Sequence, residues 1–197
     1  LLLFLIVAIT LSDANSQNQL LTVAENSDFK STGEYNDVIK FVSELQESNF
    51  EYLTIDTIGF SIEGKPIPLM IIGNPLPSNH NDIGERLVVY LQANIHAGEV
   101  EGKEAVQMLA RDLLKDPNSE LMKNLVLLIT PILNIDGNDK ISTSNRRNQV
   151  GPVNGVGVRY NGQHLDLNRD AMKMETPEIK AVITRVLNTW DPQISVD

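Results

Sequence analysis

Two continuous apolar stretches, at residues 87–95 and 125–133, constrain the fold of this chain more than any other feature. Strands without polar alternation are typical of a sheet that is buried on both faces. Helical spacing of apolar residues predicts an amphipathic helix between the two stretches, over residues 100–115. Its inner face is expected to carry Val106, Leu109 and Leu113. The order strand, helix, strand favours parallel pairing with the helix packed on the sheet.

The other elements are predicted from periodicity and from turn residues. Residues 52–58 and 67–72 are expected to form a hairpin, with Gly64 in the turn between them. The Ser31-x-x-Glu34 spacing resembles a capping box and predicts a helix over residues 35–47.

Later in the chain, a proline at the first helical position predicts a helix that starts at residues 176–177 and ends near Trp190. A last strand is expected to start at Gln193. The long polar segment 138–164 between these parts is expected to be a loop that is either functional or disordered. The fold class is therefore α/β, with a mixed, largely parallel central sheet and helices on both faces.

The chain begins with an apolar run of eleven residues, LLLFLIVAITL. This run is too short to span a bilayer, which takes about 20 helical residues, and it matches the core of a secretory signal. We expect residues 1–14 to be an incomplete signal peptide, cleaved after Ala14, so that the mature protein is secreted or periplasmic and not bound to a membrane. A buried strand or helix, or a membrane anchor truncated at its start, is the alternative.

After this run, residues 15–30 are expected to be a loose polar lead-in, and residues 31–197 to form one domain. The sequence starts with Leu rather than Met and ends where a strand has just begun. We therefore expect the chain to be part of a longer protein.

Composition excludes several classes of function. Lys and Arg number 16 and Asp and Glu 26, giving a net charge of −10, which argues against nucleic acid or an anionic membrane as partner. Cysteine is absent, so a disulfide framework, a cysteine nucleophile and a cysteine metal site are excluded.

The first group of candidate functional residues is His96 and Glu99, with Gly98 between them. They follow the first apolar stretch, and ligand sites of α/β sheets lie at the carboxyl ends of strands. An imidazole and a carboxylate are both zinc ligands. A His-x-x-Glu pair by itself is also common among solvated surface residues, so the pair needs support from other residues.

Two further groups, residues 145–148 and 166–170, lie in or after the long polar loop. In the second group, the amide of Asn168 and the guanidinium of Arg169 are suited to hold a carboxylate, unless Arg169 forms an ion pair with a neighbouring aspartate. Asp166 is positioned to orient a zinc-bound imidazole, as carboxylates commonly do.

In the first of these groups, Arg146 or Arg147 can direct positive charge at a developing oxyanion, although a solvated loop is the simpler interpretation. His164 is a rival third metal ligand, for which solvent exposure is the simpler interpretation. His80 lies among loop residues and has no expected role.

Five motifs in order resemble the zinc carboxypeptidases of peptidase family M14, over about residues 31–197. They are IGFSIEGKPI at 58–67, NIHAGE at 94–99, PILNIDG at 131–137, NRRN at 145–148 and DLNRD at 166–170. The resemblance implies a zinc carboxypeptidase-like fold, truncated here to the N-terminal part of the catalytic domain. It also implies a Zn²⁺ cofactor and hydrolysis of the C-terminal peptide bond of a peptide or protein with a free C-terminal carboxylate.

Residue by residue, the resemblance implies that His96 and Glu99 are two of the three zinc ligands and that Asp166 hydrogen-bonds His96. It further implies that Asn168 and Arg169 bind the terminal carboxylate. The catalytic role implied for Arg146 is to polarise the scissile carbonyl and stabilise the oxyanion.

The chain departs from the family pattern at two places. Digestive members carry an Arg where this chain has Gly98, and the family's third ligand, capping Tyr and general-base Glu are expected after Asp197. The 197 residues alone are therefore expected to be inactive. Two alternatives remain open: an N-acyl amino acid deacylase of the same fold, and a non-catalytic binding module.

Overall fold

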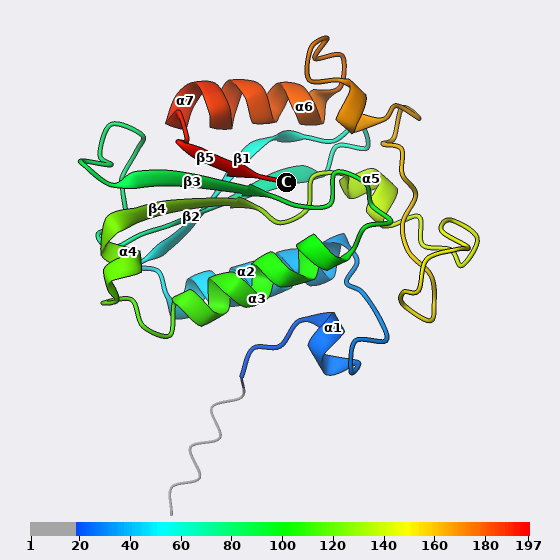
Figure 1. Ribbon diagram of the computed structural model, residues 1–197, viewed down its shortest axis with the longest axis horizontal. Coiled ribbons are helices and arrows are strands. Elements are labelled where there is room, and N and C mark those ends of the chain that lie inside the picture. Colours follow the sequence, from blue (N-terminus) through cyan, green and yellow to red (C-terminus); the bar gives the residue numbers. More distant parts are fainter. Residues whose placement is uncertain (1–18) are drawn as a thin grey trace, which may run out of the picture.

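The structure, a computed structural model, describes residues 19–197 and has a five-stranded sheet at its centre (Figure 1). The signal peptide predicted at residues 1–14 lies outside the described residues. The strands are β1 (Leu53–Phe60), β2 (Pro66–Ile72), β3 (Leu87–Gln92), β4 (Leu125–Thr130) and β5 (Ile194–Val196). The longer helices are α2 (Tyr35–Ser48) and α3 (Glu101–Leu113), together with the continuous run α6 (Pro177–Ala181), η2 (Val182–Leu187) and α7 (Asn188–Trp190). Short helices are α1 (Val23–Asn26), α4 (Glu120–Asn124), α5 (Ile135–Asn138) and the 3₁₀ turn η1 (Leu167–Arg169).

The sheet is mixed, with the strand order β1-β2-β4-β3-β5. Strand β2 pairs antiparallel with both β1 and β4, whereas β3 pairs parallel with both β4 and β5. The predicted α/β fold with a mixed sheet is thereby confirmed, and its parallel part is the three strands β4, β3 and β5. Because β3 and β4 run in the same direction, their carboxyl ends lie at one edge of the sheet.

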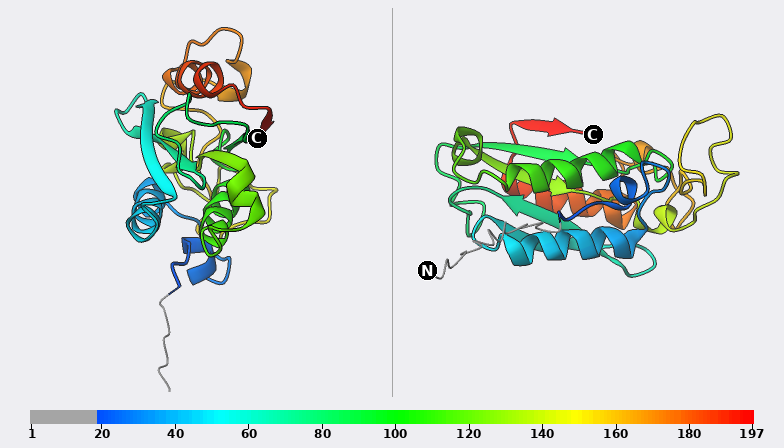
Figure 2. Two further views of the ribbon diagram at one scale, coloured as in Figure 1. Left: turned by 90° about the vertical axis from the view of Figure 1, so that its left-hand side faces the viewer. Right: turned by 90° about the horizontal axis from the view of Figure 1, so that it is seen from below.

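Helices cover both faces of the sheet, as predicted. Helices α2 and α3 lie side by side on one face, and the run from α6 to α7 covers the other (Figures 1 and 2). The core residues of this run are Ile179, Val182, Val186 and Trp190. On the opposite face, α2 and α3 contribute Phe41, Val42, Leu45, Val106 and Ala110. Each such side chain stabilises the fold by roughly 1.5–3 kcal/mol when fully buried.

The helix starts were predicted correctly, but one cap was wrong. The Thr176 hydroxyl accepts from the Ile179 amide and proline occupies the first turn, which confirms the start of α6. Helix α2 starts at Tyr35 as expected, yet its capping box is formed by Glu34 and Asp37. The Ser31 amide instead donates to the Ser27 hydroxyl at 2.9 Å, because the chain turns before the helix begins.

The inner face of α3 differs from the prediction. Val106 is buried, but Leu109 is 41% exposed, and Lys103, Gln107 and Ala110 are buried in its place. These positions follow the 3.6-residue period, so the helix is rotated toward Lys103, whose ammonium finds buried acceptors.

The lead-in at residues 19–30 is more ordered than predicted. Thr22 and Glu25 form a capping box at the start of α1. The Glu25 carboxylate also accepts from Arg111 of α3 at 2.7 Å, with both side chains largely buried. This ion pair attaches the lead-in to the domain. Between residues 19 and 197, no helix has the length and apolar character needed to cross a membrane.

Glu178 of α6 is fully buried and fixes the end of the long loop. Its carboxylate accepts from the Asn161 amide at 3.2 Å, and its other oxygen has no partner among the described residues. Burial raises the pKa of Glu178, and the charges of Asp136 and Asp170 add to this effect. The folded state therefore holds the proton more tightly than the unfolded state, so stability is lost as pH rises through the folded pKa.

We expect Glu178→Gln to become progressively more stable relative to wild type as pH rises from 4 to 7, reaching on the order of 1 kcal/mol. Urea unfolding at several pH values measures this difference, and Glu175→Gln, at an exposed position before the same helix, is the control. A pH-independent difference between Glu178→Gln and wild type would contradict the expectation.

Candidate metal centre

The candidate site lies where β3 and β4 end. Strand β3 stops at Gln92 rather than at the predicted residue 95, because Asn94 adopts a left-handed conformation with φ of 62°. Single hydrogen bonds still join the two segments beyond the strands: Leu133 N donates to Ala93 O, and Asn134 N to Asn94 O, each at 3.1 Å. These bonds hold the turn that carries His96.

His96 and Glu99 converge as predicted from their spacing. The Glu99 amide donates to the His96 carbonyl at 2.8 Å, which closes a tight turn. The His96 ring is 5% exposed, and its Nδ1 lies 3.3 Å from the Glu99 carboxylate. An imidazole nitrogen and a carboxylate oxygen facing each other form a donor set that suits zinc, so these residues fit as two ligands of one ion.

Asp166 lies on the other side of the same ring. Its Oδ1 is 3.0 Å from His96 Nε2 and also accepts from the Asn168 amide, which caps η1. This is the position of a carboxylate that orients a metal-binding imidazole.

Between residues 19 and 197, no group of three or more His, Asp or Glu side chains is arranged to hold a metal ion.

Arg146 reaches the site from the long loop and donates to Glu99 Oε1 at 2.7 Å. Its side chain crosses directly over Gly98. A Cβ at residue 98 would lie 2.8 Å from Arg146 Nε and 2.9 Å from Arg146 Cγ, closer than such atoms approach. The glycine therefore allows Arg146 to cross at this point.

The predicted carboxylate-binding pair is only partly at the site. Asn168 lines a cavity of about 410 Å³ together with His96, Glu99 and Asn94. Arg169 is exposed and donates to the Asn168 carbonyl at 2.7 Å, and it does not line this cavity. The role of Arg169 in carboxylate binding remains a prediction.

Two carboxyl groups at the site are held in their anionic form. Burial raises the pKa of Glu99, but the hydrogen bond from Arg146 and the adjacent His96 outweigh it and leave the pKa lowered. Burial also raises the pKa of Asp166, but the hydrogen bonds from His96 and Arg159 outweigh this effect and leave the pKa lowered. Both groups therefore offer negative charge at neutral pH.

Asn94 adds an unsatisfied acceptor to the cavity. Its side chain is 5% exposed, and its amide nitrogen donates weakly to the Glu99 carbonyl at 3.4 Å. The Oδ1 atom has no partner within the described part of the chain. A buried unpaired oxygen costs about 1–3 kcal/mol. A ligand that donates to Asn94 Oδ1 would remove this cost.

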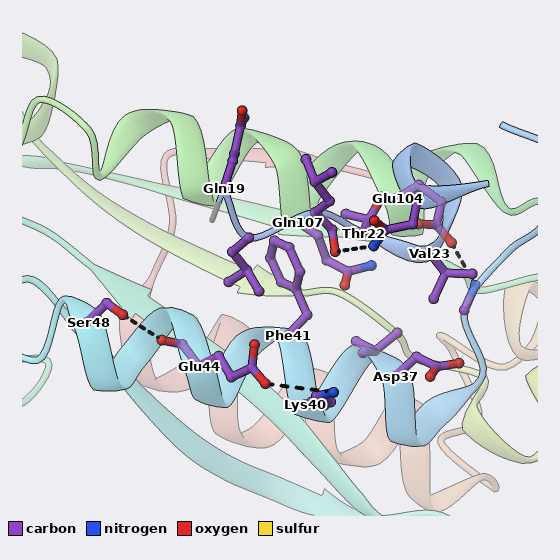
Figure 3. A pocket seen from close by; sticks show the side chains of 15 residues that line it. Gln19, Thr22, Val23, Asp37, Lys40, Phe41, Glu44, Ser48, Glu104 and Gln107 are labelled. Atoms are coloured by element: carbon purple, nitrogen blue, oxygen red, sulfur yellow. Dashed lines mark hydrogen bonds and ion pairs between the residues drawn. The ribbon is translucent and has the colours of Figure 1, made fainter. Parts of the chain in front are cut away.

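A larger cavity, of about 620 Å³, lies between the lead-in, α2 and α3 (Figure 3). It is lined by residues such as Phe41, Glu44, Glu104 and Gln107, and by none of the predicted site residues. The smaller cavity is therefore the one that carries the candidate chemistry.

Arg159 is a residue of the site that no sequence pattern predicted. Its Nε and Nη2 both lie 3.0 Å from Asp166 Oδ2, and its Nη1 lies 3.3 Å from His96 Nδ1. The available signal was an arginine seven residues before Asp166 in the same polar loop. The other two histidines lie elsewhere: His164 is exposed, and His80 packs edge-on against Trp190.

Comparisons with known proteins identify the family of the chain. The family described as zinc carboxypeptidase (peptidase M14) matches residues 38–189. Carboxypeptidase 2 of Trichophyton rubrum is 26% identical over 163 residues, covering 80% of this chain and 26% of that protein. Carboxypeptidase O of Bos taurus is 28% identical over 106 residues, which cover 51% of this chain and 27% of that protein. The chain thus spans about a quarter of the length of these curated relatives.

Solved structures show the same fold. Carboxypeptidase A of Helicoverpa armigera superimposes with a TM-score of 0.61 at 19% identity, covering 88% of this chain and 49% of that chain. A metallo-carboxypeptidase of Burkholderia cenocepacia gives a TM-score of 0.58 at 22% identity, and the match covers 78% of this chain and 38% of that chain. With more than half of its residues matched by the family and a sheet shared with these structures, the chain belongs to the zinc carboxypeptidase family, peptidase M14.

Proposed function

We propose that the protein is a zinc-dependent carboxypeptidase, which hydrolyses the C-terminal peptide bond of peptides or proteins. The observation that carries this proposal is the His96 ring, which lies between Asp166 on one nitrogen and Glu99 beside the other. This arrangement suits a metal-binding imidazole with an orienting carboxylate. Because the chain spans a quarter of its curated relatives, the activity of the whole protein is part of the proposal.

The residues of this chain have separate tasks in the proposed reaction. His96 and Glu99 hold the zinc ion, and Asp166 fixes the ring of His96. When bound, zinc polarises a carbonyl and lowers the pKa of a bound water to about 7. Arg146, which now donates to Glu99, supplies a cation for the scissile carbonyl oxygen.

Substrate recognition is assigned to Asn168 and Arg169. An amide and a guanidinium together match the two oxygens of a terminal carboxylate. Asn168 already lines the cavity beside His96, and Arg169 is the next residue, with an exposed side chain free to turn toward a ligand. This assignment makes the free C-terminus of the substrate a requirement.

The test is made on the protein at its full encoded length. We expect it to release C-terminal amino acids from a peptide, to lose activity with a chelator, and to regain it with Zn²⁺. The same peptide with an amidated C-terminus is expected to react more slowly by on the order of a hundredfold, since Asn168 and Arg169 lose their partner. Amino acid release is measured by mass spectrometry.

An N-acyl amino acid is tested in the same assay as the control substrate. Faster hydrolysis of the acyl amino acid than of the peptide would replace the proposal with a deacylase. No zinc-dependent hydrolysis of either substrate would replace it with a binding module.

A further inference from the structure

Arg159 joins the two residues on which the candidate metal centre depends. Its guanidinium contacts Asp166 Oδ2 through two nitrogens, each at 3.0 Å. The other oxygen of the same carboxylate, Oδ1, contacts His96 Nε2 at 3.0 Å. Asp166 therefore lies between the guanidinium and the imidazole and uses one oxygen for each.

The third guanidinium nitrogen contacts the ring itself. Arg159 Nη1 lies 3.3 Å from His96 Nδ1, the nitrogen that faces Glu99. The Asp166 carboxylate accepts at Nε2, so the ring donates from Nε2, and Nδ1, 3.3 Å from both Arg159 Nη1 and the Glu99 carboxylate, is the nitrogen available to a metal shared with Glu99. A nitrogen with its lone pair free of a proton is the form that ligates a metal.

The backbone at Arg159 is held by the segment after β4. The side-chain nitrogen Nδ2 of Asn134 donates to the Arg159 carbonyl at 2.9 Å and to the Ile95 carbonyl at 3.5 Å, while its side-chain oxygen Oδ1 accepts from Gly137 N at 3.0 Å. The neighbouring Val158 amide donates to the Gly137 carbonyl at 2.9 Å. These bonds give a structural reason for the PILNIDG segment, which supplies no side chain to the metal centre.

From these contacts we infer that Arg159 is a positioning residue: it locks the Asp166 carboxylate and, through it, the ring of His96 with Nδ1 directed toward Glu99. The inference rests on the proposed zinc site. If His96 Nδ1 held a metal ion, Arg159 Nη1 would give up its single contact to that nitrogen, and its two contacts to Asp166 would remain. The ion pair also balances the charge of Asp166, which is only partly exposed.

The experiment uses the chain labelled with ¹⁵N at histidine, which gives signals from only three rings. In wild type, the Nε2–H proton of His96 is expected to give a downfield signal that exchanges slowly with water, because Asp166 holds it. In Arg159→Gln this signal is expected to broaden or disappear, and Zn²⁺ affinity, measured by competition with a chelating dye, to fall roughly tenfold. His80 and His164 serve as internal references.

Two further variants separate positioning from a general effect on the fold. Arg159→Lys keeps one charged hydrogen bond to Asp166 and is expected to fall between wild type and Arg159→Gln. Arg185→Gln removes an equal charge from an exposed position on η2 and is expected to change neither signal nor affinity.

The inference is overturned if Arg159→Gln retains the protected His96 signal, or if its Zn²⁺ affinity equals or exceeds that of wild type. A wild-type chain that binds no Zn²⁺ would instead count against the proposed function. In that case the ring-proton signal alone still decides whether Arg159 positions His96.

Discussion

A His96→Gln protein is expected to lose Zn²⁺ binding by at least about a hundredfold and hydrolytic activity by on the order of a thousandfold. The glutamine amide can still donate to Asp166, so the loop should keep its place, but the aromatic nitrogen beside Glu99 is gone. Glu99→Gln is expected to act in the same direction, because it removes the anionic ligand and the partner of Arg146. Chelator competition measures the affinity, and peptide hydrolysis by the full-length protein measures the activity.

His164→Asn is the matched control for the loss of an imidazole. His164 is exposed and has φ of 61°, a conformation that asparagine tolerates well. We expect this variant to bind zinc and hydrolyse peptide as wild type does. Zinc loss in His164→Asn but not in His96→Gln would move the metal centre away from the end of β3.

The largest effect on stability is expected from Lys103→Met, at on the order of 3 kcal/mol. Lys103 is fully buried, and its ammonium donates to the Gly33 carbonyl and, at 2.7 Å, to the Asn138 side chain. It also lies 4.0 Å from the buried Glu104 carboxylate. Removing one member of a buried charge pair leaves the other charge buried without a partner, which typically lowers the free energy of unfolding by about 3–5 kcal/mol.

The expected loss is at the lower end of this range because burying Lys103 is itself costly. Burial, partly offset by the charges of Glu104 and Asp139, lowers the pKa of Lys103 from 10.5 to about 8. A shift of this size corresponds to about 3 kcal/mol at neutral pH. The double variant Lys103→Met with Glu104→Gln is therefore expected to regain more than half of the lost stability.

The same pKa predicts a pH dependence. Between about pH 8 and 10.5 the unfolded chain keeps the Lys103 proton and the folded chain has released it, so wild-type stability rises with pH in this window. Lys103→Met lacks this contribution, and the stability difference between the two proteins should widen from pH 7 to pH 10. Urea unfolding at each pH measures it.

Lys115→Met is the control for the loss of a lysine, at a position two residues after the end of α3. Lys115 is 56% exposed and pairs with Asp112, so its loss is expected to change stability by less than about 0.5 kcal/mol. A Lys103→Met protein as stable as this control would show that Lys103 is not the counter-charge of Glu104.

Much of the fold was predictable because local signals coincided with tertiary packing. The apolar run of β4 is buried on both faces, as its lack of alternation predicted, whereas β3 differs from the prediction: only Val88 and Tyr90 are fully buried, and Leu87 is 49% exposed. The start of α6 follows from Thr176 and Pro177. Where a local signal had a competitor, it failed: the Ser31 spacing resembled a cap, but Asp37 provides the capping carboxylate for Glu34.

The candidate site was predicted unevenly for a related reason. Residues His96 and Glu99 are close in sequence, so their spacing already brings them together, and Asp166 was expected beside His96 both as an orienting carboxylate and from the family resemblance. Arg159 has no spacing rule, since the loop that carries it has no regular structure. Its contacts with Asp166 and His96 exist only because that loop is fastened to Asn134 and Gly137.

By itself, the sequence determined the strands, the longer helices and the closeness of His96 and Glu99 after β3, because hydrophobic periodicity and short motifs act over a few residues. Only the tertiary structure decided which side chains of the long loop reach that pair. It placed Arg146 across Gly98 and Arg159 against His96, and it left the Arg169 side chain exposed. The physical reason is that contacts across 47 to 70 residues of chain depend on packing and on backbone hydrogen bonds, which no local pattern encodes.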